Sequence, residues 1–304
     1  MTISKFDVII VGGNYAGLAA GMALGRALKT VLIIDSGYPC NRQTPYSHNF
    51  LTQDGQSPSE ILALAKQQLQ KYHTVSFFNG LADAAIKNTD GFELQLTSGE
   101  KFKAKKLIFA TGIRDIMANV EGFDECWGIT ALHCPYCHGY EVKNENTGIL
   151  GNGDSAYDLA RLISNWSDKL TLFTNGPSTL TTTQTIQLKK RSIELTEKPL
   201  QKLNHINGNL QDIAFEDGTK AFISVIYAPV PFSQHCHIPE SLGCQLTEDG
   251  YLKIDAFQQT TVEGVFACGD NVTRMRTVAN AVAMGTAAGM AASKKMILEE
   301  FDSL

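Results

Sequence analysis

The first 35 residues contain two short apolar runs separated by a glycine-rich turn and a helical pattern. A β-branched run over residues 8–11 leads into the turn at 12–17, an Ala/Leu-rich stretch follows, and a second run over 31–34 ends in Asp35. Short apolar runs are typical of buried strands, and apolar residues three or four positions apart are typical of a helix. Strand, glycine turn, helix and strand form the βαβ pattern of a dinucleotide-binding unit.

The same pattern returns later in the chain. A strand is expected over 148–150, a turn over 151–156, a helix to about Asn165 and a further strand over 169–173. Equivalent turn residues of the two copies lie 139 positions apart. The sequence therefore predicts an internal repeat of one βαβ unit.

The repeat extends beyond the turns, but at a different spacing. In the first half a hairpin is expected from 92–96 and 101–109, ending at Ala110-Thr111-Gly112. In the second half it is expected from 210–215 and 220–227. Equivalent residues of the two hairpins lie 118 positions apart, whereas those of the two turns lie 139 apart. The first half therefore carries a net insertion of 21 residues between its turn and its hairpin. The insertion follows Asp35 and contains Cys40, His48 and an expected helix over 57–72.

The end of the chain completes the first copy. A strand over 264–267 precedes Cys268-Gly269-Asp270 and a helix of small residues over 277–298. We expect an α/β fold of two Rossmann-like, three-layer domains. The first domain is discontinuous, with residues 1–113 and 231–304, and the second covers 114–230.

Composition narrows the choice of partners. The 304 residues carry a formal net charge of −5 without a basic tract, which argues against nucleic acid. No secretory signal is recognised at the start, and Asn280 and Thr286 interrupt the longest apolar stretch, so we expect a cytoplasmic protein without a membrane span. Seven scattered cysteines do not form a disulfide framework.

The first turn is a candidate dinucleotide site. Gly12 and Gly17 allow a tight bend against pyrophosphate, and Asp35 can accept hydrogen bonds from a ribose diol. Asn14 replaces the middle glycine of the motif, and asparagine tolerates left-handed geometry.

The second turn is less complete. Gly151 and Gly153 are present and Ala156 substitutes for the third glycine, but Thr174 stands where the first copy has Asp35, and no Arg pair follows it. Binding of a nicotinamide nucleotide and a retained scaffold that no longer binds both remain open. The residues concerned are Gly151, Gly153, Asp154, Ser155 and Ala156.

A Cys-Pro-Tyr-Cys-His motif is the candidate reactive centre. Cys134 at a helix start would have a lowered thiol pKa, and proline is tolerated in the first turn. His138 would exchange protons near neutral pH during dithiol–disulfide chemistry. Two alternatives are attachment of c-type haem and zinc binding through Cys134, Cys137 and Cys126 with His133 or His138. Haem attachment normally needs export, and zinc sites normally need a second ligand pair. We therefore expect no metal.

The chain has two glycine turns of the dinucleotide-binding type, the Cys-Pro-Tyr-Cys-His motif and the segment 264–270, in that order. In these features it resembles the low-molecular-weight thioredoxin reductases, which are FAD-dependent pyridine nucleotide-disulfide oxidoreductases. The resemblance implies that Cys137 faces the flavin as the charge-transfer thiolate, that Cys134 exchanges with substrate sulfur, and that the protein is a homodimer. The FAD-contacting residues expected on this basis are Gly12, Gly13, Asn14, Ala16, Gly17, Asp35, Ser36, His48, Ala110, Thr111, Gly112, Gly269, Asp270 and Thr277.

Departures from that pattern point to one branch. Thioredoxin reductases have an acid where this chain has His138, and His-Arg-Arg where it has Thr174-Asn175-Gly176. These features and the segment 47–51 resemble the gliotoxin-type dithiol oxidases. We therefore expect oxidation of a dithiol through FAD, with oxygen or another acceptor taking the electrons and His138 as acid/base. The alternatives are an NAD(P)H-dependent disulfide reductase and a flavin redox sensor without turnover. A small dithiol or disulfide and a thioredoxin-like protein are both possible partners.

The remaining cysteines and small residues have plainer expected roles. Cys236 and Cys244 could shuttle electrons but are expected to be buried thiols or loop residues. We assign Cys40, Cys126 and Cys268 to packing. The same applies to Ala279, Ala281 and Gly285 in the last helix.

Overall fold

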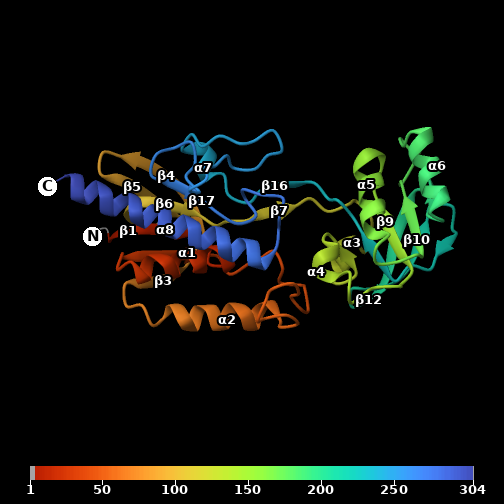
Figure 1. Cartoon of the computed structure of the whole chain (residues 1–304), viewed down its shortest axis with the longest axis horizontal. Coiled ribbons are helices and arrows are strands. Elements are labelled where there is room, and N and C mark those ends of the chain that lie inside the picture. The colour runs from red at the N-terminus through yellow and green to blue at the C-terminus, as the bar shows by residue number, and fades with distance from the viewer. Residues whose placement is uncertain (1–3, 304) are drawn as a thin grey trace. The chain divides into compact units, whose positions relative to one another are not determined.

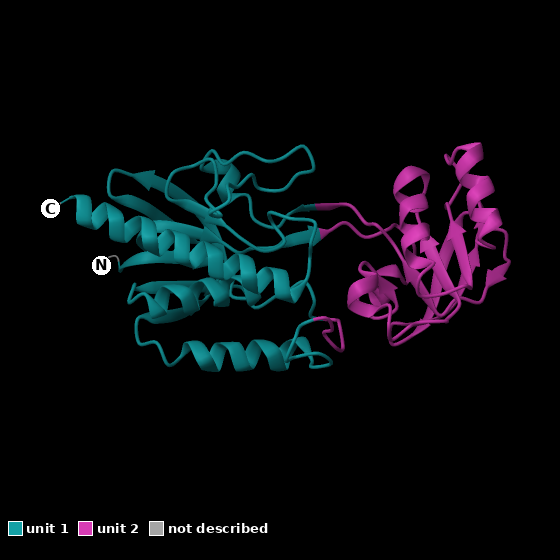
Figure 2. Cartoon of the chain, viewed as in Figure 1, with its two compact units in different colours: residues 1–42, 50–114, 233–304 teal, residues 43–49, 115–232 magenta. Residues whose placement is uncertain are grey.

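The computed structural model describes residues 4–303 and divides into two compact units, shown in Figure 2. Unit 1 takes in the described residues up to Arg42, those from Phe50 to Arg114, and those from Ser233 onward. Unit 2 comprises residues 43–49 and 115–232. The short segment 43–49, which the sequence leads us to place in the first domain, thus groups with the second unit.

Unit 1 is built on a seven-stranded sheet with the order β3-β2-β1-β6-β5-β4, and β17 also pairs with β6. β1, β2, β3, β6 and β17 run parallel, while β4 and β5 are antiparallel additions. The strands are β1 (Lys5–Val11), β2 (Val31–Asp35), β3 (Val75–Asn79), β4 (Ala82–Asn88), β5 (Gly91–Leu96), β6 (Lys101–Phe109) and β17 (Val265–Ala267).

Three helices cover one face of this sheet. Val8 and Ile10 of β1 lie in one core cluster with residues of α1 (Tyr15–Arg26), α2 (Pro58–Leu69) and α8 (Val278–Asp302). The alternate residues Ile9 and Val11 lie in the cluster of the opposite face, which includes α7 (Ile238–Ser241). Figure 1 shows α8 running beside α1 over the sheet.

Unit 2 repeats the arrangement with five parallel strands in the order β11-β10-β9-β15-β8. They are β8 (Ala131–Leu132), β9 (Thr147–Leu150), β10 (Leu170–Phe173), β11 (Glu194–Thr196) and β15 (Val225–Tyr227). α5 (Gly153–Ile163) and α6 (Thr182–Lys190) pack on one face. On the other lie α3 (Phe123–Cys126) and a sheet of β12 (Leu200–Ile206), β13 (Asn209–Phe215) and β14 (Lys220–Ala221).

The two copies differ in one strand. β6 is continuous and pairs with β5 at its start and with β17 at its end. The equivalent stretch 220–227, expected as one strand, is broken into β14 and β15, which belong to different sheets. Where the chain leaves and re-enters unit 1, β7 (Ile113–Asp115) pairs with β16 (Phe232–Gln234).

Candidate functional site

The parallel strands of unit 1 bring the expected cofactor residues to one edge. β1 ends before Gly12, β2 ends at Asp35, β6 ends before Ala110 and β17 ends before Cys268. Neighbouring parallel strands place their carboxyl ends together, and ligands of open α/β sheets bind there.

The first turn requires glycine at two positions. A Cβ at Gly12 would lie 2.2 Å from the carbonyl oxygen of Ala110, and one at Gly17 would lie 1.8 Å from that of Gly12. Asn14 has an extended backbone rather than the left-handed one that its side chain would tolerate. Its side chain caps α1 by accepting a hydrogen bond from the Tyr15 N–H at 2.8 Å. The turn survives the loss of the middle glycine because Asn14 acts as a helix cap.

Two carboxylates at this edge lie near cations. Asp35 Oδ2 is 3.8 Å from Lys66 Nζ on α2, and Asp270 Oδ2 is 3.6 Å from Arg276 Nε. A Cβ at Gly13 would lie 2.8 Å from the Asp35 Cβ, so glycine is needed beside this acid. Ser36, next to Asp35, is half-buried.

Two of the expected cofactor residues, Ala16 and Thr277, also have contacts within the protein. Ala16 is buried, and a Cβ on Gly285 of α8 would lie 2.0 Å from the Ala16 carbonyl oxygen. Thr277 is the N-cap of α8 and accepts a hydrogen bond from the Asn280 N–H at 3.1 Å. These contacts fix the start of α8 against α1.

The carboxyl edge of the unit 1 sheet has polar groups that fit FAD. One of them is the side-chain amide of Asn271, which the sequence analysis did not identify. Asn271 is fully buried and donates through Nδ2 to the Phe109 carbonyl oxygen at 2.9 Å. Its Oδ1 is buried with no hydrogen-bond partner among residues 4–303. Asn271 Nδ2 also donates to the Thr111 hydroxyl at 3.4 Å, and a Cβ at Gly112, the next residue in the chain, would meet no atom within 4 Å. An acceptor, an acid and a glycine turn at one helix start match the polar groups of FAD.

The CxxC motif lies in unit 2, directly after β8. Cys134 is the N-cap of α4 (Pro135–His138), with proline in the first turn as expected. Both Cys134 and Cys137 are half-buried. A Cβ on Gly139, which ends α4, would lie 2.7 Å from Trp166, so the loop needs glycine there.

A titratable cluster surrounds α4, all of it within unit 2. Burial, and secondarily the nearby His48, lower the pKa of His138 to about 4. The expectation that His138 titrates near neutral pH is therefore wrong, and the imidazole is neutral at pH 7. His48 Nδ1 lies 3.6 Å from Glu141 Oε1. Segment 43–49 thus brings His48 to the CxxC motif, which the spacing of the motifs did not reveal.

The second turn is filled by its own loop. Asn152 Oδ1 accepts hydrogen bonds from the N–H groups of Gly153 and Thr179 at 2.9 and 2.8 Å, and from the Thr179 hydroxyl at 3.0 Å. Asn152 Nδ2 donates to the Pro177 carbonyl oxygen at 2.8 Å. The Thr174 hydroxyl donates to the Gly176 carbonyl oxygen at 2.6 Å.

Acids lie around this turn. Asp154 is exposed in the first turn of α5, next to the exposed Ser155, and its Oδ1 accepts from Gln184 Nε2 at 2.7 Å. Glu197 Oε1 accepts from the Ser178 N–H at 2.8 Å. Ala156 is buried beneath the turn, and Gly153 has a φ of +67°. The turn before α5 keeps the backbone geometry of a nucleotide site. The carboxylates of Asp154 and Glu197 put negative charge around this turn, where a nucleotide phosphate would bind.

The other cysteines divide as follows. Cys126 and Cys268 are buried, as expected, and burial raises the pKa of the Cys268 thiol to about 12. Burial also raises the pKa values of Cys236 and Cys244, and both pack in the core of unit 1. Cys40 is exposed, so its assignment to packing is wrong. Ala279 is likewise exposed, whereas Ala281 is buried as expected.

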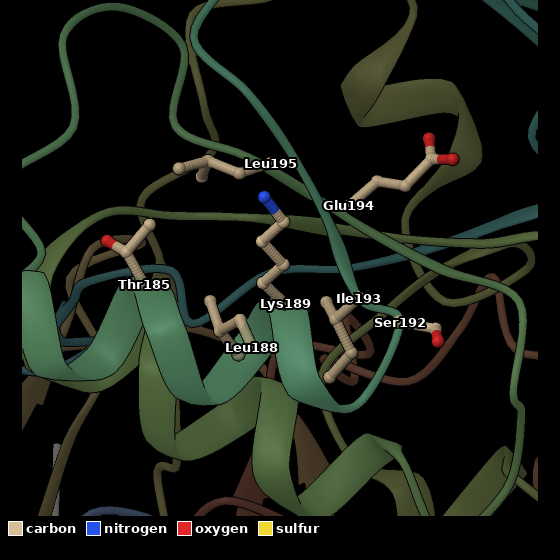
Figure 3. Close-up of a pocket in the computed structure, with 7 residues that line it drawn as sticks. All are labelled: Thr185, Leu188, Lys189, Ser192, Ile193, Glu194 and Leu195. Carbon is tan, nitrogen blue, oxygen red and sulfur yellow. The ribbon is translucent and has the colours of Figure 1, made fainter.

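A cavity of about 490 Å³ in unit 2 lies away from this chemistry. It is lined by residues of α6 and β11, including Leu188, Lys189 and Glu194 (Figure 3). β11 and β8 are opposite edges of the five-stranded sheet, so the cavity and the CxxC motif lie at opposite ends of the strand order. No described helix is both long enough and apolar enough to cross a membrane.

Comparison with known proteins gives a consistent result. The family model described as pyridine nucleotide-disulphide oxidoreductase matches residues 6–285. The chain is 32% identical to a thioredoxin reductase, tcpT, of Claviceps purpurea, over 98% of this chain and 96% of that protein.

Solved structures agree. HlmI superposes with a TM-score of 0.93 at 30% identity, covering 98% of this chain and 95% of that chain. An oxidoreductase from Agrobacterium tumefaciens superposes with a TM-score of 0.90 at 34% identity, covering 97% and 99%. The chain belongs to the pyridine nucleotide-disulphide oxidoreductase family and is an FAD enzyme similar to thioredoxin reductases.

Proposed function

We propose that the chain is a thiol oxidase that takes two electrons from a small dithiol through Cys134 and Cys137 and delivers them to oxygen without a nicotinamide nucleotide. In the net reaction the dithiol loses two electrons and two protons and becomes a disulfide, and oxygen gains both and becomes hydrogen peroxide. FAD, when bound, supplies a two-electron acceptor that oxygen can reoxidise. We further propose unit 1 as the FAD-binding domain and a homodimer as the assembly.

The observation that carries the proposal is the occupied second turn. A nicotinamide nucleotide would need the N–H groups at the start of α5 for its pyrophosphate. Asn152 caps α5 at the Gly153 N–H as Asn14 caps α1 at the Tyr15 N–H, so this contact alone does not exclude a nucleotide. The difference is that Asn152 also holds the loop through Thr179 and Pro177. Nothing equivalent to the Asp35 carboxylate stands at Thr174, whose hydroxyl is bound within its own loop.

The chain's own residues support the thiol chemistry in three ways. Cys134 lies before α4, where a substrate thiolate would attack its sulfur in the Cys134–Cys137 disulfide, forming a mixed disulfide and releasing Cys137 as the thiolate. The second substrate thiol would then displace Cys134, which leaves the substrate disulfide and the reduced pair. Cys137, one turn later, would form the internal disulfide with Cys134. The imidazole of His138 is neutral at pH 7, so it can accept a proton from an incoming thiol. Its low pKa makes it a weak base.

Reduction of a disulfide by NAD(P)H is the second candidate. Relatives whose names describe thioredoxin reductases and alkyl hydroperoxide reductases favour it. The kept backbone geometry at Gly153 also favours it.

Anaerobic mixing separates the two functions. We expect dithiothreitol to bleach the flavin absorbance of the holoprotein, and neither NADPH nor NADH to do so within the turnover time measured with dithiol. Air should then restore the absorbance with release of hydrogen peroxide. Cys134→Ser should lose the bleaching by dithiol, while Cys236→Ser, which changes a core thiol of unit 1, should keep it. Rapid bleaching by either nucleotide would show a reductase.

A further inference from the structure

Tyr15 joins two parts of the connection between β2 and α2 through one hydroxyl. The residue is the first of α1, directly after the capping Asn14, and is 8% exposed in the core cluster of α1, α2 and α8. Its Oη donates to the Pro58 carbonyl oxygen at 3.2 Å and accepts from Asn41 Nδ2 at 3.3 Å. A tyrosine hydroxyl can donate one proton and also accept, so both capacities are used.

The two partners lie on different limbs of this connection. The connection belongs to unit 1 before and after segment 43–49, which groups with unit 2. Asn41 lies on the outgoing limb, two positions before that segment, and Pro58 lies at the end of the returning limb. Phe50, the first residue of the returning limb, packs against the same core cluster as Tyr15. The Tyr15 hydroxyl therefore holds the two limbs together at the start of α1.

These limbs lead to the acid of the expected cofactor edge. Asp35 ends β2, and the outgoing limb begins at the next residue. The returning limb leads into α2, which places Lys66 Nζ 3.8 Å from Asp35 Oδ2. Gly13 of the glycine turn also lies against this acid, because a Cβ there would lie 2.8 Å from the Asp35 Cβ. The hydroxyl thus fixes both the chain that follows Asp35 and the helix that contacts it.

The ring and the hydroxyl of Tyr15 have separate roles. A phenyl ring alone would fill the core position, whereas the hydroxyl bonds to partners 26 and 43 residues further along the chain. Burial raises the pKa of Tyr15, so the hydroxyl keeps its proton at neutral pH and remains a donor. The hydroxyl is therefore a link between distant segments, beyond its contribution to packing.

We propose that Tyr15 is a positioning residue of the FAD site. The latch, meaning the two hydrogen bonds of its hydroxyl, keeps the connection closed beside the glycine turn and slows the release of FAD. This inference rests on the proposed placement of FAD in unit 1. Opening of the connection displaces the chain that follows Asp35 and the start of α2, so FAD is released from the open arrangement and its release rate follows the frequency of opening.

The test compares two tyrosine-to-phenylalanine changes in one core. Tyr15→Phe removes the latch and keeps the ring. Tyr72→Phe is the matched control, because Tyr72 packs against the same cluster but its hydroxyl accepts from Arg26 Nη1 at 3.4 Å. Two rates are measured on the full chain. Trypsin cleavage after the exposed Arg42 is followed by mass spectrometry with and without bound FAD, and release of FAD from the holoprotein is followed by flavin fluorescence.

For Tyr15→Phe we expect both rates to rise about tenfold, because two hydrogen bonds of modest net strength are lost from the closed connection. Tyr72→Phe should change neither rate. Asn41→Ala removes one of the same hydrogen bonds, so it should also speed the cleavage. Combined with Tyr15→Phe it should give no further increase in cleavage, because both changes break one link, whereas independent structural effects would add.

The possible failures are distinguishable. Unchanged cleavage in Tyr15→Phe, or additive cleavage in the double variant, would overturn the latch. Faster cleavage with unchanged release of FAD would overturn its role in the FAD site. Asp35→Ala tests the placement of FAD separately, because it should speed the release of FAD whether or not the latch exists. Unchanged release in Asp35→Ala would contradict the placement of FAD in unit 1. Neither rate involves an electron acceptor, so both are independent of the oxidase reaction.

Discussion

The two cysteines of the motif occupy different positions on α4. Cys134 precedes the helix and Cys137 lies within it, and both are half-buried. The division of labour inferred from the family resemblance gives Cys137 to the flavin and Cys134 to the substrate. This assignment can be tested one residue at a time.

We expect the reduced Cys134→Ser holoprotein to show long-wavelength absorbance from a thiolate next to the oxidised flavin, because Cys137 remains. Cys137→Ser should not show it. Visible spectra recorded anaerobically between pH 6 and 9 measure the band. The reverse pattern, with the band kept by Cys137→Ser, would exchange the two roles.

The low pKa of His138 makes stability depend on pH. Its folded-state pKa of about 4 lies below the usual 6.5, so the unfolded chain binds the proton more readily. This contribution to stability is complete above pH 6.5 and is lost as the pH falls toward 4. We expect the melting temperature of wild type to fall more steeply over this range than that of His138→Gln.

His73→Gln is the control for this titration, because His73 is exposed in unit 1. It should follow the wild type, as measured by calorimetry at several pH values. Equal slopes for wild type and His138→Gln would mean that the folded protein does not depress the pKa of His138.

Sequence reasoning identified Cys134, Cys137 and His138 correctly as neighbours but not the protonation state of the histidine. That state depends on burial and on His48, which is far away in the chain. Asn271 gave no signal either, because its residue type does not show that the side chain is fully buried and bound to the Phe109 carbonyl oxygen.

At the scale of elements, α1 and α8 pack through small residues. A Cβ on Gly285 would lie 2.0 Å from the Ala16 carbonyl oxygen, and one on Gly289 would lie 2.5 Å from that of Ala20. Backbone of one helix therefore touches backbone of the other, and α8 is fixed where it begins, close to Thr277 and Asp270.

Gly285→Ala should destabilise unit 1. In an exposed helix this change would stabilise by up to about 1 kcal/mol, whereas here the added methyl overpacks the contact by about 1–3 kcal/mol. We expect a lower melting temperature and a lower FAD content per chain, measured by absorbance. Thr286→Ala, at the next and exposed position of α8, is the control and should match the wild type.

Asn152 can be tested as the residue that closes the second turn. Asn152→Gly should free the Gly153 N–H and the loop carrying Thr179, so NADPH should bind more tightly than to wild type. Quenching of protein fluorescence during a titration measures this binding. Asn165→Gly, after the end of the same helix, should have no such effect. Equal affinities of wild type and Asn152→Gly would show that Asn152 does not block the turn.

Regular elements were predicted best where the pattern was local. β6 has the expected limits, and β2, β5, β9, β10, β13 and β17 agree with their expected ranges within one residue, because alternating or continuous apolar runs define them. β1 begins three residues before its expected start, and β4, β7, β8, β12 and β16 were not predicted. The break between β14 and β15 was not predicted. Phe222 lies between these strands, and phenylalanine is a common strand residue, so its residue type does not show that the side chain is exposed. The single-turn helices α3, α4 and α7 have too few residues to show a period.

At the scale of the whole molecule, the repeat explains the fold and its exceptions. Both units have a parallel sheet with a glycine turn after one strand, which the two motifs predict. Segment 43–49 could not be assigned from sequence, because its grouping with unit 2 comes from contacts such as that of Gln43 with the Asp124 carbonyl oxygen at 3.3 Å. Such contacts join positions far apart in the chain.

The discontinuity of unit 1 sets an order of events during synthesis. β17 pairs with β6, and α8 packs on α1, so the first unit lacks a strand and a helix until residues 265–302 have been synthesised. Residues 115–232 of unit 2 are continuous and emerge earlier. A nascent chain stalled after residue 260 should therefore give a protease-resistant fragment from unit 2 before it can retain FAD, so that the thiol centre is assembled before its cofactor site.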